Sequence, residues 1–154
     1  MEQFDLVVIG SGPGGYRAVV LAALMPIVAG IGGNSGNQTI TMIVRAIAMG
    51  KVQPDAMRRL LRKELGVASF NGLIWGSLLG LAAWSLYGSV KLGLVMTAAM
   101  TLNLLLAATA GVGIPLLRQK FGADPAVGGS VMITALTDSG GFFIFLGLAT
   151  LFLM

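Results

Sequence analysis

The sequence contains no cysteine and no histidine among its 154 residues. It therefore has no disulfide, no thiolate or imidazole metal site and no histidine acid–base catalyst. The metal ligands that remain are oxygen atoms, which suit hard cations such as Mg²⁺ and Ca²⁺. Any metal site in this chain must therefore be built from oxygen ligands.

Charge is also scarce, because only 10% of the residues are charged while 56% are hydrophobic. This composition excludes an ordinary soluble globular protein. The net charge of +4 does not indicate a nucleic-acid partner, since the basic residues sit mainly beside apolar runs, where they set membrane topology. The acidic start, with Glu2 and Asp5, lacks the basic region of a signal peptide.

The sequence contains four long runs that are uncharged or nearly so. They cover roughly Ala18–Val44, Val67–Val90, Leu92–Leu117 and Pro125–Met154, the last interrupted by one aspartate. Each reaches the length of about 20 residues that a membrane-spanning helix needs. The amphipathic segment Asp55–Leu65 predicts a separate short interfacial helix that anchors the topology. We therefore predict an all-α, polytopic membrane helix bundle with about four transmembrane helices, embedded in a lipid bilayer.

Basic residues concentrate in two connections, near residues 45–66 and 118–124. The positive-inside rule places both in the cytoplasm of a multi-pass protein of the bacterial inner (plasma) membrane. Residues 1–16 then lie outside the cytoplasm. Asp124 and Pro125 predict the start of the last helix, as its N-cap and first residue.

Small and polar residues predict how the helices pack. Gly72, Gly76 and Gly80 recur every four residues, so this helix should approach a neighbour at backbone distance. Asn103, at membrane depth, predicts an interhelical hydrogen bond.

Asp138 is an acidic side chain within an apolar stretch that is long enough to cross a bilayer. Placing a carboxylate at the bilayer centre costs roughly 2.5–3.5 kcal/mol on insertion scales unless it meets water, a cation or a partner. Such a residue lines an ion or proton path, or it forms a structural hydrogen bond to a neighbouring helix.

Two polar faces accompany this carboxylate. Ser130, Thr134 and Asp138 share one stripe of the last helix. The first apolar run has a comparable face, which is either a cation-facing surface or a tight helix contact; it comprises Gly30, Gly33, Asn37 and Thr41. Both faces should turn toward each other and toward water, because polar groups facing lipid stay unsatisfied. One carboxylate per chain suits a cation that keeps its water shell, and a two-fold dimer would pair two such carboxylates.

Residues 1–22 resemble the N-terminal FAD-binding fingerprint of dihydrolipoamide dehydrogenase-type oxidoreductases. The pattern is a predicted strand over Phe4–Ile9 followed by Gly10, Gly12 and Gly15. No second strand and no ribose-binding acid follow in Ile31–Gln38, and the redox cysteine pair of that family is missing. We therefore interpret residues 1–16 as a segment that is not a functional domain and binds no cofactor.

The remaining motifs resemble the membrane domain of MgtE-family magnesium transporters. The resemblance covers roughly Leu24–Met154 and rests on three stretches: Pro26–Thr39, Val44–Lys51, and Asp124-Pro-Ala with Thr134–Phe142. It implies a homodimer with five transmembrane helices per subunit that conducts hydrated Mg²⁺ along an axial pore. Asp138 would be the pore carboxylate, and the six other residues of the two polar faces would line the ion site.

The resemblance also has departures. It implies that residues 17–154 form a transmembrane domain without the family's first helix and without its cytoplasmic regulatory region, a helical domain followed by CBS modules. A gate that senses cytosolic Mg²⁺ is then not expected. Three hypotheses remain open: a magnesium-conducting pore that performs no catalysis, a truncated or fused membrane fragment that does not transport, and a membrane-tethered flavin- or nicotinamide-binding protein.

Overall fold

The computed structural model describes residues 13–51 and 54–153, and within these ranges the chain forms four helices and no strand. They are α1 (Pro13–Ala48), α2 (Pro54–Tyr87), α3 (Val90–Lys120) and α4 (Gly129–Leu153). Each is long and apolar enough to cross a membrane. The prediction of an all-α bundle with about four spanning helices is confirmed, whereas the strand predicted over Phe4–Ile9 lies outside the described residues.

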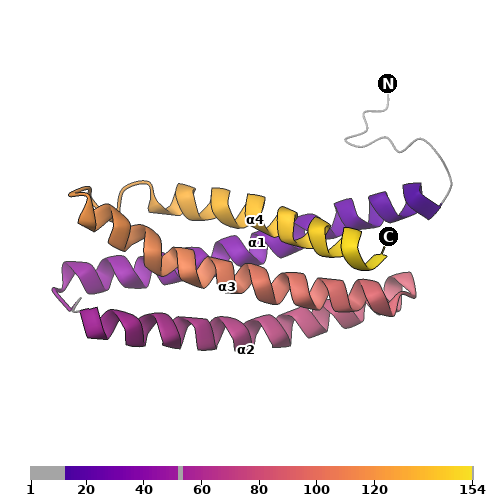
Figure 1. Ribbon diagram of the computed structural model, residues 1–154, viewed down its shortest axis with the longest axis horizontal. Coiled ribbons are helices and arrows are strands. Elements are labelled where there is room, and N and C mark those ends of the chain that lie inside the picture. Colours follow the sequence, from indigo (N-terminus) through magenta and orange to yellow (C-terminus); the bar gives the residue numbers. More distant parts are fainter. Residues whose placement is uncertain (1–12, 52–53, 154) are drawn as a thin grey trace, which may run out of the picture.

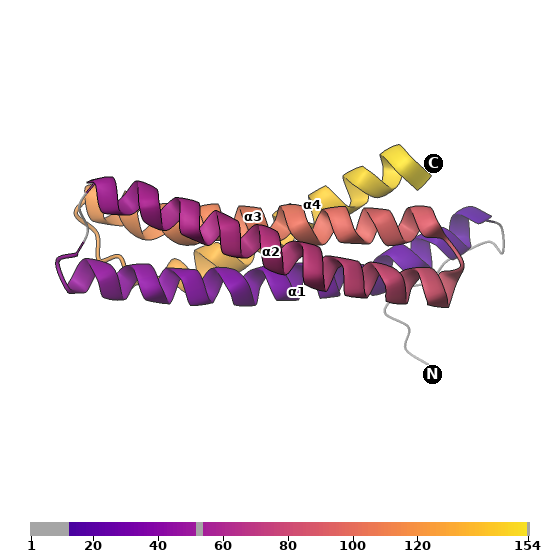
Figure 2. The same ribbon diagram turned by 90° about the horizontal axis from the view of Figure 1, so that it is seen from below.

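The helices run up and down along one long axis (Figures 1 and 2). The α1–α2 and α3–α4 connections lie at one end of the bundle. The α2–α3 turn lies at the other end, together with the start of α1 and the end of α4. Helix α2 packs against α3, while α1, α3 and α4 all contact one another. The two basic connections predicted to share one side of the membrane therefore lie at the same end of the molecule.

Helix α3 is the central element of the bundle. Its fully buried side chains include Met96, Met100 and Leu104, which join Val28 of α1 and Phe145 of α4 in one hydrophobic cluster. A helix that is apolar all round is typically buried all round. The other helices therefore pack around α3 and keep large apolar side chains on their outer faces.

The predicted glycine stripe lies at the α2–α3 interface. A Cβ atom added at Gly72 would lie 2.8 Å from the Thr101 Cα, and one added at Gly76 would lie 2.9 Å from the Thr97 carbonyl oxygen. The Thr97 hydroxyl donates a hydrogen bond to the Gly76 carbonyl at 3.0 Å. Backbone contact at this interface confirms the prediction, because a larger residue would push the two helices apart.

The prediction of a separate interfacial helix is wrong. Asp55–Leu65 forms the first part of α2, which continues without a break into the membrane-spanning part. This segment contains neither proline nor glycine, and Gly66, which follows it, remains helical. The change from charged to apolar sequence thus marks where the helix enters lipid rather than where a helix ends.

The predicted start of the last helix is also wrong. Asp124 accepts a hydrogen bond from the Ala126 backbone N–H at 2.9 Å and so stabilises a turn that precedes the helix. Gly128 has a φ of 68°, a conformation that favours glycine, and α4 begins at the next residue. The aspartate–proline pair therefore shapes the α3–α4 connection instead of capping α4.

Candidate functional site

Asn37 joins the two predicted polar faces where α1 packs against α4. The Ser130 hydroxyl donates to the Asn37 Oδ1 at 2.7 Å, and the Asn37 Nδ2 lies 3.5 Å from the Thr134 hydroxyl, to which it donates. Both ends of one amide on α1 are thus engaged by hydroxyls one turn apart on α4. The two polar faces turn toward each other, as the sequence predicted.

Asp138 lies one turn further along α4, beside Gly33. A Cβ atom added at Gly33 would meet the Thr137 Oγ1 at 3.4 Å and the Asp138 Oδ1 at 4.0 Å. The absence of a side chain on α1 therefore leaves room next to the carboxylate. Within the described part of the chain, the hydrogen bonds between α1 and α4 near this carboxylate go to Asn37 and not to Asp138. The alternative of an aspartate held by a neighbouring helix finds no partner among these residues.

Gly30 and Thr41 mark the two ends of the α1 face. Gly30 is exposed, and a Cβ atom added there would meet nothing within 4 Å. Thr41 donates to the Asn37 carbonyl of its own helix at 2.8 Å. It also lines a hollow of about 300 Å³ together with Pro125 and Ser130. These two residues therefore flank the α1–α4 contact without bonding across it.

The sequence reasoning missed polar residues on the neighbouring stripe of α1. Asn34 and Gln38 line an open groove of about 670 Å³, which includes Asn37 and Thr41 and ends at Arg45. Their spacing of four residues is the sequence signal that identifies this second polar stripe. The polar surface of α1 is therefore wider than predicted.

Asn103 of α3 packs against both α1 and α4 next to the site. Its Nδ2 donates to the Val28 carbonyl of α1 at 2.8 Å, which confirms the predicted interhelical hydrogen bond. A Cβ atom added at Gly141 of α4 would lie 2.7 Å from the same nitrogen, and one added at Gly32 of α1 would also overlap it. Since Gly32 adjoins Gly33 and Gly141 lies one turn from Asp138, this buried amide fixes how closely α1 and α4 meet at the carboxylate.

A second polar link, between α1 and α2, was not predicted. The Thr39 hydroxyl, which is buried, donates to the Glu64 carboxylate at 3.0 Å. A separate interfacial helix would keep Glu64 away from α1, whereas the continuous helix α2 brings it there. This contact ties the charged end of α2 to the end of α1 that lies nearest the basic connections.

The site offers oxygen and amide groups with a single carboxylate. In residues 13–51 and 54–153, no three acidic side chains gather to form a metal-binding cluster. One carboxylate cannot replace the six waters of Mg²⁺, an ion that loses water reluctantly. The arrangement therefore suits a cation that keeps its hydration shell and meets hydroxyl and amide groups through it.

Comparisons with known proteins identify the family of this chain. The sequence model of the MgtE family, described as a divalent cation transporter, matches residues 25–148. The chain is 35% identical over 134 residues to the magnesium transporter MgtE of Thermus thermophilus, covering 86% of this chain and 29% of the relative. For MgtE of Enterococcus faecalis the identity is 32% over 141 residues, covering 89% and 30%. For MgtE of Bacillus subtilis it is 29% over 137 residues, again covering 89% and 30%. The chain thus spans about 30% of the length of these relatives.

The oxidoreductase resemblance of residues 1–22 is not confirmed. The family match begins at residue 25, and the three relatives are magnesium transporters. Gly10 and Gly12 lie outside the described residues, while Gly15 lies in the first turn of α1.

Proposed function

Because the chain belongs to the MgtE family of divalent cation transporters, we propose that it conducts Mg²⁺ across the bacterial inner (plasma) membrane without catalysing a reaction. Magnesium is then the transported ion rather than a resident cofactor. The membrane potential supplies the driving force, about 2.3 kcal/mol per elementary charge per 100 mV and twice that for a divalent ion.

The meeting of the two polar faces beside Asp138 is the observation that supports this proposal most strongly. Asp138 lies within the apolar helix α4, next to the space that Gly33 leaves open. A carboxylate at such depth is stabilised by water or a passing cation. The hydroxyl and amide groups of Asn37, Ser130 and Thr134 extend the polar surface along both helices, so the ion would have a continuous path.

We propose further that two copies complete the path as a homodimer. Ser130 and Thr134 are exposed on the isolated chain, as are Gly30 and Thr41. Polar surface of this kind is unfavourable against lipid, so a second copy or water must cover it. A two-fold axis beside α1 and α4 would bring two Asp138 carboxylates together and neutralise one hydrated Mg²⁺. The remaining groups in contact with the hydration shell would be Gly30, Gly33, Asn37, Thr41, Ser130 and Thr134.

The orientation follows from the distribution of charge. The α1–α2 and α3–α4 connections share one end of the bundle (Figure 1). Eight of the ten basic residues lie in or beside these two connections, whereas Arg17 lies near the start of α1 and Lys91 at the start of α3. We assign the connections near residues 45–66 and 118–124 to the cytoplasm by the positive-inside rule.

The proposal is tested by Mg²⁺-dependent growth of a strain that lacks its own magnesium transporters. The parent chain should restore growth, and Asp138→Asn should lower Mg²⁺ uptake at least tenfold because it removes the charge while keeping the shape. Thr109→Ala is the matched control, since this hydroxyl bonds only to its own helix α3.

Equal uptake by the parent and Asp138→Asn would contradict the pore assignment. A parent chain that inserts into the membrane but restores no growth would favour the non-transporting fragment.

We assign residues 17–154 to a transmembrane domain and no nucleotide site to residues 1–16. Deletion of residues 1–12 should leave uptake unchanged, and the purified protein should show no flavin absorbance. Bound flavin would support the third hypothesis instead.

A further inference from the structure

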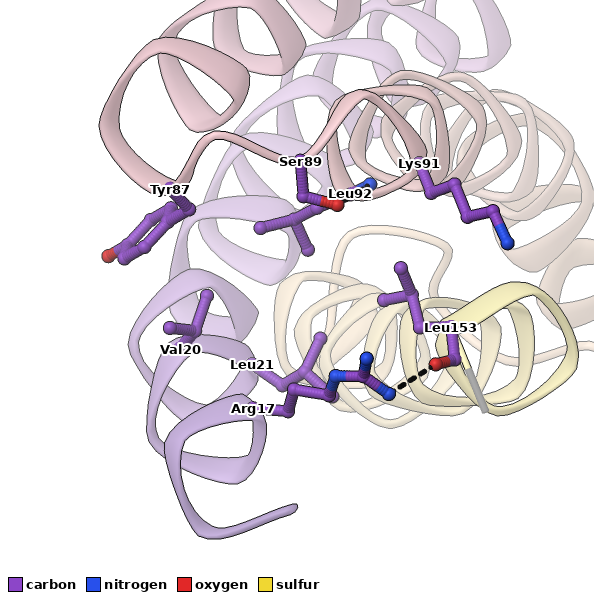
Figure 3. A pocket seen from close by; sticks show the side chains of 8 residues that line it. All are labelled: Arg17, Val20, Leu21, Tyr87, Ser89, Lys91, Leu92 and Leu153. Carbon is purple, nitrogen blue, oxygen red and sulfur yellow. Dashed lines mark hydrogen bonds between the residues drawn. The ribbon is translucent and has the colours of Figure 1, made fainter. Parts of the chain in front are cut away.

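A hollow of about 280 Å³ lies at the end of the bundle opposite the basic connections (Figure 3). All four helices and the α2–α3 turn contribute to its lining, which consists of Arg17, Val20, Leu21, Tyr87, Ser89, Lys91, Leu92 and Leu153. Half of its lining residues are aliphatic, and the Arg17 guanidinium and the Lys91 ammonium lie on the side of Leu153, whereas the Tyr87 hydroxyl points away from them. The cation-conducting path proposed above uses none of these residues.

The polar groups of this hollow favour an anion. Two of the eight described lining residues are cationic, Arg17 and Lys91, and none of the eight is acidic. Arg17 is held in place because its Nη1 donates to the Leu153 carbonyl at 2.7 Å, and its other N–H groups have no hydrogen-bond partner within residues 13–51 and 54–153. Ser89 caps the N-terminus of α3 by accepting from the Leu92 N–H at 3.3 Å, so the positive end of that helix dipole adds to the two charges.

An apolar groove continues from the same lysine. Lys91 also lines a second hollow of about 410 Å³ between α3 and α4, whose other lining residues are Leu94, Val95, Ala98, Leu148, Leu151 and Phe152. The stretch of α3 from Lys91 to Ala98 spans about 10 Å at 1.5 Å per residue. A cationic head site thus opens onto an apolar channel along the helix surface.

The position along the membrane fits this pair of hollows. Trp84 and Tyr87 end α2 at the same level, and Trp84 is 48% exposed. Aromatic side chains of this kind gather at the depth of the lipid headgroups. The charged hollow therefore lies at headgroup depth and the apolar groove at acyl-chain depth.

We propose that this end of the bundle binds one anionic glycerophospholipid. The lipid phosphate lies between the Arg17 guanidinium and the Lys91 ammonium, and one acyl chain occupies the groove between α3 and α4. Arginine and lysine both bind phosphate oxygens through charge-assisted hydrogen bonds, and basic pockets between membrane helices hold anionic lipid headgroups. The bound lipid would join α1, α3 and α4 at the end of the bundle where α4 terminates.

The test uses the full chain purified in detergent and mixed with dioleoyl-phosphatidylglycerol or dioleoyl-phosphatidylcholine, which have the same acyl chains. Native mass spectrometry then measures the lipid that each protein retains. The parent should retain phosphatidylglycerol in preference, and Arg17→Gln/Lys91→Gln should retain at least fivefold less of it. Arg58→Gln/Arg59→Gln removes the same charge from exposed positions at the other end of the bundle and should behave like the parent.

Three further measurements distinguish bound lipid from a bound free anion and from a folding defect. Ala98→Phe keeps both charges but fills the groove, so it should also lower retention of phosphatidylglycerol. Millimolar inorganic phosphate should not displace the lipid. Lys91→Arg, with Arg17 unchanged, keeps both positive charges and should retain phosphatidylglycerol like the parent. This result would show that the double Gln variant loses the lipid because it loses the charges. Equal retention of the two lipids, an equal loss in the Arg58/Arg59 variant, or displacement by phosphate would overturn the proposal. Transport enters none of these readouts, so they stand apart from the test of the cation path.

Discussion

The α2–α3 and α1–α4 interfaces both contain glycines, but the glycines have different effects. At α2–α3, Gly72 and Gly76 let one backbone touch the other, and an added Cβ would lie within 2.9 Å of backbone atoms. At α1–α4, Gly33 leaves an added Cβ 3.4 Å from the Thr137 hydroxyl and 4.0 Å from the Asp138 carboxylate. The first interface is filled by backbone, whereas the second is closely packed at Gly36 against Ile133 but has room for a methyl group at Gly33, beside a charge.

This difference suggests that one interface stabilises the bundle and that the other serves transport. Close backbone contact between small residues is what holds membrane helices together, because lipid chains are as apolar as leucine and provide no hydrophobic driving force between helices. Polar groups that remain exposed contribute little to this packing and require water or protein to cover them. We infer that α2–α3 holds the bundle together and that α1–α4 accommodates the ion.

The largest effect on stability is expected at the α2–α3 interface. Gly76→Ala would place a methyl group 2.9 Å from the Thr97 carbonyl oxygen, so the helices must shift. We expect the free energy of unfolding to fall by about 1–3 kcal/mol. Reversible unfolding in mixed detergent–SDS micelles measures this change.

Gly66→Ala is the matched control on the same helix, since an added Cβ meets nothing within 4 Å there. It should stabilise the protein by about 0.5–1 kcal/mol through helix propensity. Equal effects of the two substitutions would contradict the assignment of α2–α3 as the close-packed interface.

A smaller effect is expected at Asn103, which links the two interfaces through α3. Asn103→Ala removes the hydrogen bond to the Val28 carbonyl and should lower the free energy of unfolding by about 1 kcal/mol. Thr109→Ala, whose hydroxyl bonds only within α3, should leave stability unchanged. An unchanged unfolding curve for Asn103→Ala would show that the amide does not hold α1 in place.

The smallest change in stability is expected at Gly33. The methyl group of Gly33→Ala would lie at ordinary contact distance from Thr137 and Asp138, so stability should change by less than about 0.5 kcal/mol. Uptake of Mg²⁺ should still fall roughly fivefold, about 1 kcal/mol in the barrier, because the methyl group would narrow the proposed ion path beside the carboxylate. Gly147→Ala on α4, outside the proposed ion site, meets nothing within 4 Å and should leave uptake intact. Equal uptake by both variants would argue against an ion passing at Gly33.

The sequence predicted the fold well where one physical rule decided the outcome. Apolar length placed the four spans, and the four-residue glycine period placed the α2–α3 contact. The amphipathic pattern of Asp55–Leu65 predicted a separate helix and was wrong. The pattern marks where charged sequence gives way to apolar sequence, but it does not show that the helix continues. The capping prediction at Asp124 was also wrong, because an aspartate can either cap a helix or stabilise a turn. Here Asp124 stabilises a turn, and α4 begins only after Gly128, which has a positive φ.

In the candidate site, too, some contacts could be predicted from the sequence and others could not. Helical spacing placed Asn37, Ser130 and Thr134 on facing stripes, and the structure joins them. The link from Thr39 to Glu64 could not be predicted, because it depends on how the charged end of α2 leans against α1. Contacts within a stripe follow from the helical period, whereas contacts between helices depend on packing angles that a single sequence does not contain.

The central claim is that water and cations reach the α4 face that carries Asp138. The chain has no cysteine, so single cysteines introduced at Thr134 and Leu136 can be compared directly in liposomes. At 3.6 residues per turn the two positions lie on nearly opposite faces of α4. A water-soluble cationic thiosulfonate should label Thr134→Cys, more slowly when Mg²⁺ is present, and should leave Leu136→Cys unlabelled. Labelling of neither position, or labelling of Thr134→Cys at a rate that Mg²⁺ does not change, would contradict an ion path between α1 and α4.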